Sequence, residues 1–121
     1  DITLIGAGET VRIILDAAEL LGQMGVKARV LNMHTIKPLD KKAIIAAARE
    51  TGGIVTVEEH SVFGGLGAAV AEVVVQHQPV PMKMLGIPDE PAIAGKTAEV
   101  FEHYGLTSEN ISKIVLELMN K

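Results

Sequence analysis

The sequence contains no cysteine among its 121 residues. This absence excludes disulfide bonds, thiolate catalysis and any metal site with cysteine ligands. The sequence also has no apolar run that approaches the ~20 residues of a membrane-spanning helix, and no charged segment followed by an apolar leader. We therefore expect a soluble, cytoplasmic protein. Because the chain starts at Asp1 and enters an apolar stretch at Ile2, we also expect it to be a piece of a longer polypeptide.

Aromatic residues are scarce, and Phe63, Phe101 and Tyr104 are the complete set. Since 48% of the residues are hydrophobic, the core has to be built from Val, Ile, Leu, Ala and Met. An aliphatic core of this kind is typical of a parallel sheet that is covered by helices on both faces. The length predicts a single domain over residues 1–121, with one core.

Basic clusters are also lacking. The formal net charge is −4, and Lys and Arg are spread along the chain without a dense group. Because nucleic acids and anionic membranes are recognised through basic patches, we expect neither as a partner.

Apolar patterns that are present predict alternating strands and helices. Short aliphatic stretches predict strands at residues 2–5, 26–33, 54–60 and 81–87. Helical spacing and capping residues predict helices from about 11 to Gly25, from Asp40 to Thr51, and over 66–77, 97–104 and from Thr107 onward. With right-handed crossovers, this alternation predicts a three-layer α/β fold with a mostly parallel sheet.

One polar, glycine-rich segment follows the third expected strand, and its residues are Glu58, Glu59, His60, Ser61, Gly64, Gly65 and Gly67. Open α/β sheets bind ligands and partners at the carboxyl ends of their strands. Alternation along a strand sends Glu58 and Glu59 to opposite sides, which excludes a simple carboxylate dyad. Two interpretations stay open: a carboxylate–imidazole acid/base group, or carboxylates that cap loop amides or form ion pairs at an interface. We favour the second.

Two glycine turns invite comparison with a dinucleotide fingerprint: residues 6–11 and residues 65–70. Both carry Val at the last position of the motif, and Asn32-Met33 replaces the acid that would hold a ribose. We therefore interpret the glycines as residues that permit a sharp turn and close helix packing. His34 and His60 lack a third metal ligand, and Ser61 lacks the context of a hydrolase nucleophile.

Three groups of residues together resemble a known family: 2–9 with 31–40; 56–61 with 64–67; and 86–89 with Gly95 and 104–111. In order and spacing they are similar to the C-terminal domain of transketolase, and the resemblance covers essentially the whole chain. This domain type also occurs in 1-deoxyxylulose-5-phosphate synthase and in the β subunits of 2-oxo acid dehydrogenases. The Tyr-Gly-Leu-Thr run at 104–107 is more similar to transketolase than to the dehydrogenases.

The resemblance implies a particular sheet. Its four strands run parallel in the order 2-1-3-4, and an antiparallel edge strand comes from residues before Asp1. This order brings two groups to one crevice at the switch point, namely Gly6, Ala7 and Gly8 with Glu59, His60 and Ser61. It also separates strands two and three, which disfavours a two-histidine site.

The resemblance further implies two-carbon ketol transfer between phosphorylated sugars, with thiamine diphosphate and Mg held by two other domains, which bind the pyrimidine and the diphosphate. The sequence has no match to the Gly-Asp-Gly…Asn motif or to the activating glutamate, so no catalytic, cofactor-binding or metal-binding residue is carried over. The implied role is assembly into a homodimer or heterotetramer. Gly6, Ala7, Gly8, Glu59, His60, Ser61, Gly64, Gly65 and Gly67 are the candidate interface or anion crevice. A free-standing flavodoxin-like module that binds an anion or nucleotide is the alternative of another class.

Overall fold

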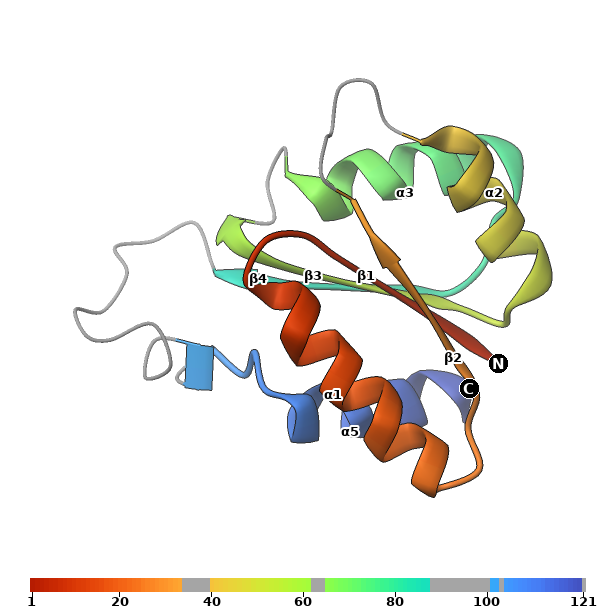
Figure 1. Ribbon diagram of the computed structural model, residues 1–121. Helices are drawn as coiled ribbons and strands as arrows, with labels where there is room; N and C mark the ends of the chain where they lie inside the picture. The colour runs from red at the N-terminus through yellow and green to blue at the C-terminus, as the bar shows by residue number, and fades with distance from the viewer. Residues whose placement is uncertain (34–39, 62–64, 88–100, 103, 121) are drawn as a thin grey trace.

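A computed structural model describes residues 1–33, 40–61, 65–87, 101–102 and 104–120 (Figure 1). Strands and helices alternate along these residues, and their bounds are β1 (Ile2–Gly6), α1 (Thr10–Gln23), β2 (Ala28–Asn32), α2 (Lys41–Glu50), β3 (Ile54–Ser61), α3 (Leu66–His77), β4 (Met82–Ile87) and α5 (Ser108–Met119). None of the helices described here is long and apolar enough to cross a membrane.

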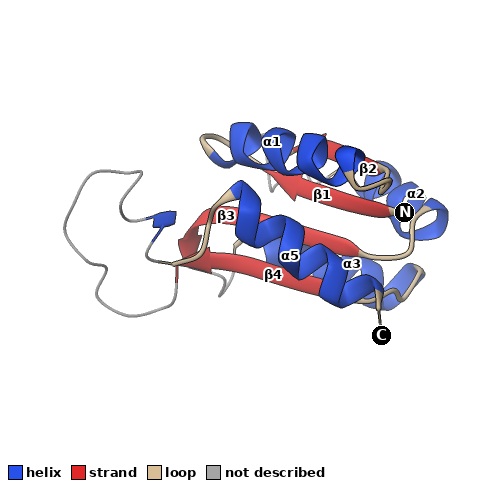
Figure 2. Ribbon diagram, turned by 90° about the horizontal axis from the view of Figure 1, so that it is seen from below, coloured by secondary structure: helices blue, strands red, loops and turns tan. Residues whose placement is uncertain are grey.

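The four described strands form one parallel sheet in the order β2-β1-β3-β4. Helices α2 and α3 lie on one face of this sheet, and α1 and α5 lie side by side on the other (Figures 1 and 2). The predicted three-layer architecture and strand order are thus confirmed. The antiparallel edge strand that the resemblance assigns to residues before Asp1 stays a prediction.

Two aliphatic clusters fill the spaces between the sheet and its helices. On the α1 and α5 side, Leu4 and Val57 pack with Ile14 and Ile111. On the α2 and α3 side, the cluster includes Ile5, Ile54, Ile44 and Val70. Because neighbouring residues of a strand point to opposite faces, the central strand β1 supplies both clusters and all five of its residues are buried. Each large aliphatic side chain buried in this way contributes about 1.5–3 kcal/mol.

The predicted helix boundaries are confirmed at three places. Asp40 Oδ1 accepts a hydrogen bond from Ala43 N at 3.1 Å, and Thr107 Oγ1 accepts one from Asn110 N at 3.2 Å. Both are N-cap bonds that satisfy an otherwise unpaired amide. Gly25 follows α1 with a φ of 82°, the left-handed conformation that glycine adopts without strain.

The start of the second strand was predicted wrongly. It begins at Ala28 and not at Val26, because Val26 N donates to Leu21 O at 2.9 Å and so still belongs to the turn that closes α1. The helix predicted over 97–104 lies mostly outside the described residues, although residues 101–102 are helical.

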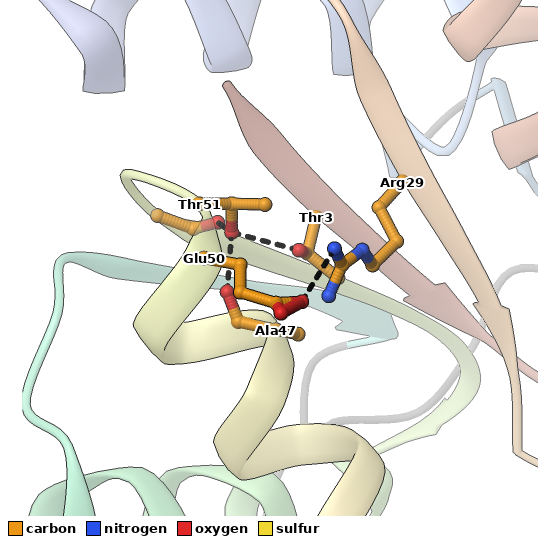
Figure 3. Close-up of polar contacts among 6 residues, drawn as sticks. Thr3, Arg29, Ala47, Glu50 and Thr51 are labelled. Carbon is orange, nitrogen blue, oxygen red and sulfur yellow. Dashed lines mark hydrogen bonds and ion pairs between the residues drawn. The ribbon is translucent and has the colours of Figure 1, made fainter.

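Hydroxyl groups close the end of the sheet where the strands begin (Figure 3). Thr3 Oγ1 in β1 lies 2.8 Å from Thr51 Oγ1, and Thr51 Oγ1 donates to Ala47 O at 2.7 Å. Nearby, Arg29 Nη2 forms an ion pair with Glu50 Oε1 at 2.7 Å. Since both ion-pair side chains are partly exposed, this pair contributes no more than about 1 kcal/mol. The α2–β3 connection is thus tied to the start of β1 by the Thr3–Thr51 hydroxyl contact and by two backbone hydrogen bonds, from Thr3 N to Gly53 O at 2.9 Å and from Gly52 N to Asp1 O at 3.0 Å.

Helix α3 approaches the sheet closely at Gly67. A Cβ atom there would lie 2.7 Å from Thr56 Oγ1 and 3.0 Å from Met84 Sδ. The Thr56 hydroxyl is buried, and within the part of the chain that the structure describes it has no hydrogen-bond partner. The prediction that glycine permits close helix packing is therefore confirmed at this position.

Replacing Gly67 with Ala is expected to lower the free energy of unfolding by about 1–3 kcal/mol, because the added methyl group must displace Thr56 or α3. Gly22→Ala is the matched control, since nothing lies within 4 Å of a Cβ atom at this position in α1. The control is expected to stabilise the fold by about 0.5–1 kcal/mol. Chemical denaturation of both variants measures the difference, and equal effects would contradict the close contact.

Candidate functional site

The carboxyl ends of the parallel strands meet at one edge of the sheet, which we call the carboxyl edge. There β1 ends at Gly6 and the neighbouring β3 ends at Ser61. From β1 the chain passes to β2 on one side, and β3 lies on the other, so the topological switch point lies between β1 and β3. The structure therefore brings the turn after β1 and the end of β3 to the same edge (Figure 1).

The turn after β1 is held by the buried hydroxyl of Thr10. Ala7 N donates to Thr10 Oγ1 at 3.0 Å, and Val57 O in β3 lies 2.9 Å from the same oxygen. A Cβ atom at Gly6 would lie only 2.8 Å from it, and Gly8 has a φ of 62°. Both glycines are thus needed for the path of the turn, and the turn is fastened to β3 within the chain itself.

The start of α3 is held by Glu58 of β3. Its Oε1 accepts a hydrogen bond from Leu66 N at 3.0 Å, and its Oε2 accepts one from Gly67 N at 2.8 Å. The N-cap residue Gly65 has no side chain to offer, so Glu58 satisfies the first amides from across the loop. A carboxylate is stabilised there by the positive end of the helix dipole and by charge-assisted hydrogen bonds. The expected capping role of an acidic side chain is confirmed for Glu58, although the amides that it binds are the first two of α3 and not those of a loop.

Glu59, His60 and Ser61 form the last three residues of β3. Pairing with β4 is irregular there: Val57 pairs with Leu85 and Ser61 pairs with Ile87, so β3 advances four residues while β4 advances two. Such a bulge changes the direction of the strand and is common beside functional sites. Of the other candidate residues, Gly65 and Gly67 lie at the start of α3, whereas Gly64 lies outside the described residues.

The candidate residues did not include Glu58 or Thr10, although both fix the geometry of the carboxyl edge. Strand alternation places Glu58 on the same face of β3 as Ile54 and Thr56. Because α3 covers this face, the alternation indicates that the Glu58 side chain points toward α3. His34 lies outside the described residues. The strand before it, β2, is separated from β3 by β1, which disfavours a metal site shared by His34 and His60.

The described residues do not fit a site for thiamine diphosphate and its metal ion. Among them, no three His, Cys, Asp or Glu side chains gather closely enough to hold a metal. The first amides of α3, which would suit a phosphate group, already bind the carboxylate of Glu58.

Glu58→Gln is expected to lower the free energy of unfolding by about 1–3 kcal/mol, because an amide NH₂ group would face one of the two backbone N–H donors. Glu72→Gln is the matched control on the exposed side of α3, and we expect it to change stability by less than about 0.5 kcal/mol. Thermal or chemical denaturation compares the two. Equal stabilities would show that the carboxylate does not hold the helix.

Comparisons with known proteins agree with this architecture. The model of the family "Transketolase, C-terminal domain" matches residues 1–111. The chain is 52% identical over 121 residues to one of the subunits of apulose-4-phosphate transketolase from Phocaeicola vulgatus, covering all of this chain and 38% of that protein. It is 43% identical over 119 residues to 1-deoxy-D-xylulose-5-phosphate synthase from Heliobacterium modesticaldum, covering 98% of this chain and 18% of that protein.

A solved structure gives the same result. The chain superimposes on a split-gene transketolase, described as an inactive β4 tetramer, with a TM-score of 0.89 and 38% sequence identity. This match covers 99% of the chain and 39% of the solved chain. The chain thus spans less than two-fifths of the length of the relatives it matches. From the family match, the sequence identities and the shared fold, we conclude that this chain belongs to the transketolase C-terminal domain family.

Proposed function

We propose that this chain is the C-terminal domain or subunit of a thiamine-diphosphate-dependent transketolase, and that it serves assembly and not catalysis. The whole enzyme would transfer a two-carbon ketol unit between sugar phosphates. Similarity over the full chain to an apulose-4-phosphate transketolase subunit and to a split-gene transketolase supports this activity. The observation that carries the assembly role is the internal Glu58 cap, because it occupies the helix terminus at which a phosphate would otherwise bind.

Thiamine diphosphate and Mg would be held by the pyrimidine-binding and diphosphate-binding domains of the same enzyme. The present chain would reach them only through protein contacts. We assign those contacts to the carboxyl edge, with Glu59, His60 and Ser61 from β3 and with the glycine turns at 6–8 and 64–67.

Three features support the carboxyl edge as a protein interface. Intramolecular hydrogen bonds fix the turn after β1 through Thr10 and the start of α3 through Glu58, so little conformational entropy remains to be lost at these residues on binding. The bulge at the end of β3 changes the strand direction at the residues that we assign to the contact. The switch point is also where α/β sheets present polar groups on a rigid scaffold. We expect a homodimer or a heterotetramer of two different polypeptides.

A second candidate is the C-terminal domain of a 1-deoxyxylulose-5-phosphate synthase, because such an enzyme is 43% identical over 119 residues. In both candidate enzymes this chain would serve assembly and not catalysis. They differ in the product of the whole enzyme, so a product assay separates them.

The chain alone is expected to show no ketol transfer with thiamine diphosphate and magnesium, and activity is expected when it is mixed with the remaining polypeptide of its enzyme. Formation of 1-deoxyxylulose 5-phosphate in the mixture would instead identify the second candidate. Activity of the chain alone would contradict the assembly role. Inactivity of every mixture would favour a free-standing module that binds an anion or nucleotide.

Combining Glu59→Ala with His60→Ala is expected to weaken assembly by at least about tenfold and to lower turnover at limiting protein concentration, because contacts at an interface are lost. Analytical ultracentrifugation and the ketol-transfer assay measure the two effects. Glu72→Ala, at an exposed position of α3 away from this edge, is the control. Unchanged assembly and turnover in the double variant would refute the proposed contact.

A further inference from the structure

A groove of about 460 Å³ separates the first turns of α1 from the start of α5. Glu9, Arg12, Ile13 and Asp16 line one wall, and their spacing places them on a single stripe of α1. The opposite side is formed by Phe101, Leu106 and the beginning of α5. Figure 2 shows α1 and α5 side by side on one face of the sheet, and both helices begin at the carboxyl edge, so the residues of the groove lie beside that edge.

The floor of the groove is apolar. Phe101 and Leu106 are 8% and 1% exposed, and they belong to the core cluster beneath α1 and α5. Ile13 is half-buried and packs against the same cluster. An apolar side chain that enters the groove would therefore extend an existing core and would not need to disrupt one.

The upper walls of the groove are mainly acidic. Glu9 and Asp16 stand on the α1 side and Glu109 stands on the α5 side, and all three are exposed. Among the lining residues that the structure describes, Arg12 is the one basic residue. The carboxylates are therefore in excess, and they lie on both sides of the apolar floor.

We propose that this groove, lined by Glu9, Asp16 and Glu109 above Ile13, Phe101 and Leu106, binds a partner polypeptide segment that carries an apolar side chain beside lysine or arginine. The apolar side chain would contact the floor. The stems of the flanking basic residues would pack along the walls while their charged groups reach the carboxylates. Charge complementarity identifies the chemistry of the partner, because an acidic segment would meet three carboxylates and, among the described lining residues, a single guanidinium.

This inference is independent of the proposed contact through Glu59 and His60, since it uses neither residue. A random peptide library displayed on phage, selected on the immobilised full chain, tests it. We expect the enriched peptides to share Leu, Met or Phe next to Lys or Arg. Synthetic copies of these peptides are expected to bind less tightly as the salt concentration rises.

Two substitutions link the bound peptides to the groove. Asp16→Lys is expected to weaken their binding by at least about tenfold, because an attractive charge becomes a repulsive one. Glu19→Lys makes the same charge change at an exposed position of α1 outside the groove, and we expect little change. Ile13→Glu should abolish binding, and circular dichroism would verify that this variant still folds. Combining Glu59→Ala with His60→Ala should leave peptide binding intact.

Three outcomes would overturn the proposal. The first is a selection without enriched peptides, or with acidic ones. The second is an equal effect of Asp16→Lys and Glu19→Lys on peptide binding. The third is self-association of the full chain that Asp16→Lys abolishes, because the occupant would then be a second copy of the same chain.

Discussion

The two hydrogen bonds from Leu66 N and Gly67 N to the Glu58 carboxylate determine how the carboxyl edge is built. They join the end of a buried central strand to the start of a helix across a loop. Because Glu58 is 5% exposed, its carboxylate oxygens depend on these two amides for the hydrogen bonds that water would otherwise supply. One acidic residue therefore fixes the first turn of α3, whose apolar face packs on the sheet.

The two ends of the sheet differ in the interactions that hold their connections. Where the strands begin, Thr3 and Thr51 bind each other, and the ion pair of Arg29 with Glu50 lies beside them. At the carboxyl edge, internal hydrogen bonds fix the turn after β1 through Thr10 and the start of α3 through Glu58, and β3 ends with a bulge. Backbone that is held by such internal hydrogen bonds suits contact with another protein surface. It is less suited to anion binding, because the helix amides are already used.

Much of the fold could be predicted from the sequence because the residues that begin and end its helices act over a few neighbouring positions. Asp40 and Thr107 are N-caps that act within one turn, and Gly25 marks the end of α1 through its own backbone. Val26 was assigned wrongly because its bond to Leu21 closes a helix and does not extend a strand. The strand order came from the family resemblance, since pairing between distant strands leaves no local pattern.

The candidate site was less predictable, because its main contacts join residues that are distant in sequence. Thr10 Oγ1 donates a hydrogen bond to Val57 O, which is 47 residues further along the chain. The groove is lined by residues of α1 and of the segment that leads into α5. Strand alternation separates Glu58 from Glu59 and supports a capping role, but it does not identify Leu66 N and Gly67 N as the amides that Glu58 binds. No comparable pattern indicates that Glu9 and Glu109 lie on opposite walls of one groove.

Amide hydrogen exchange of the full chain, alone and mixed with the remaining polypeptide of its enzyme, tests the assembly role most directly. The account predicts slower exchange in the complex at the backbone of residues 6–8 and 59–61, with little change along the outer strand β2. Unchanged exchange at the carboxyl edge, with protection confined to β2 or to no part of the chain, would contradict it.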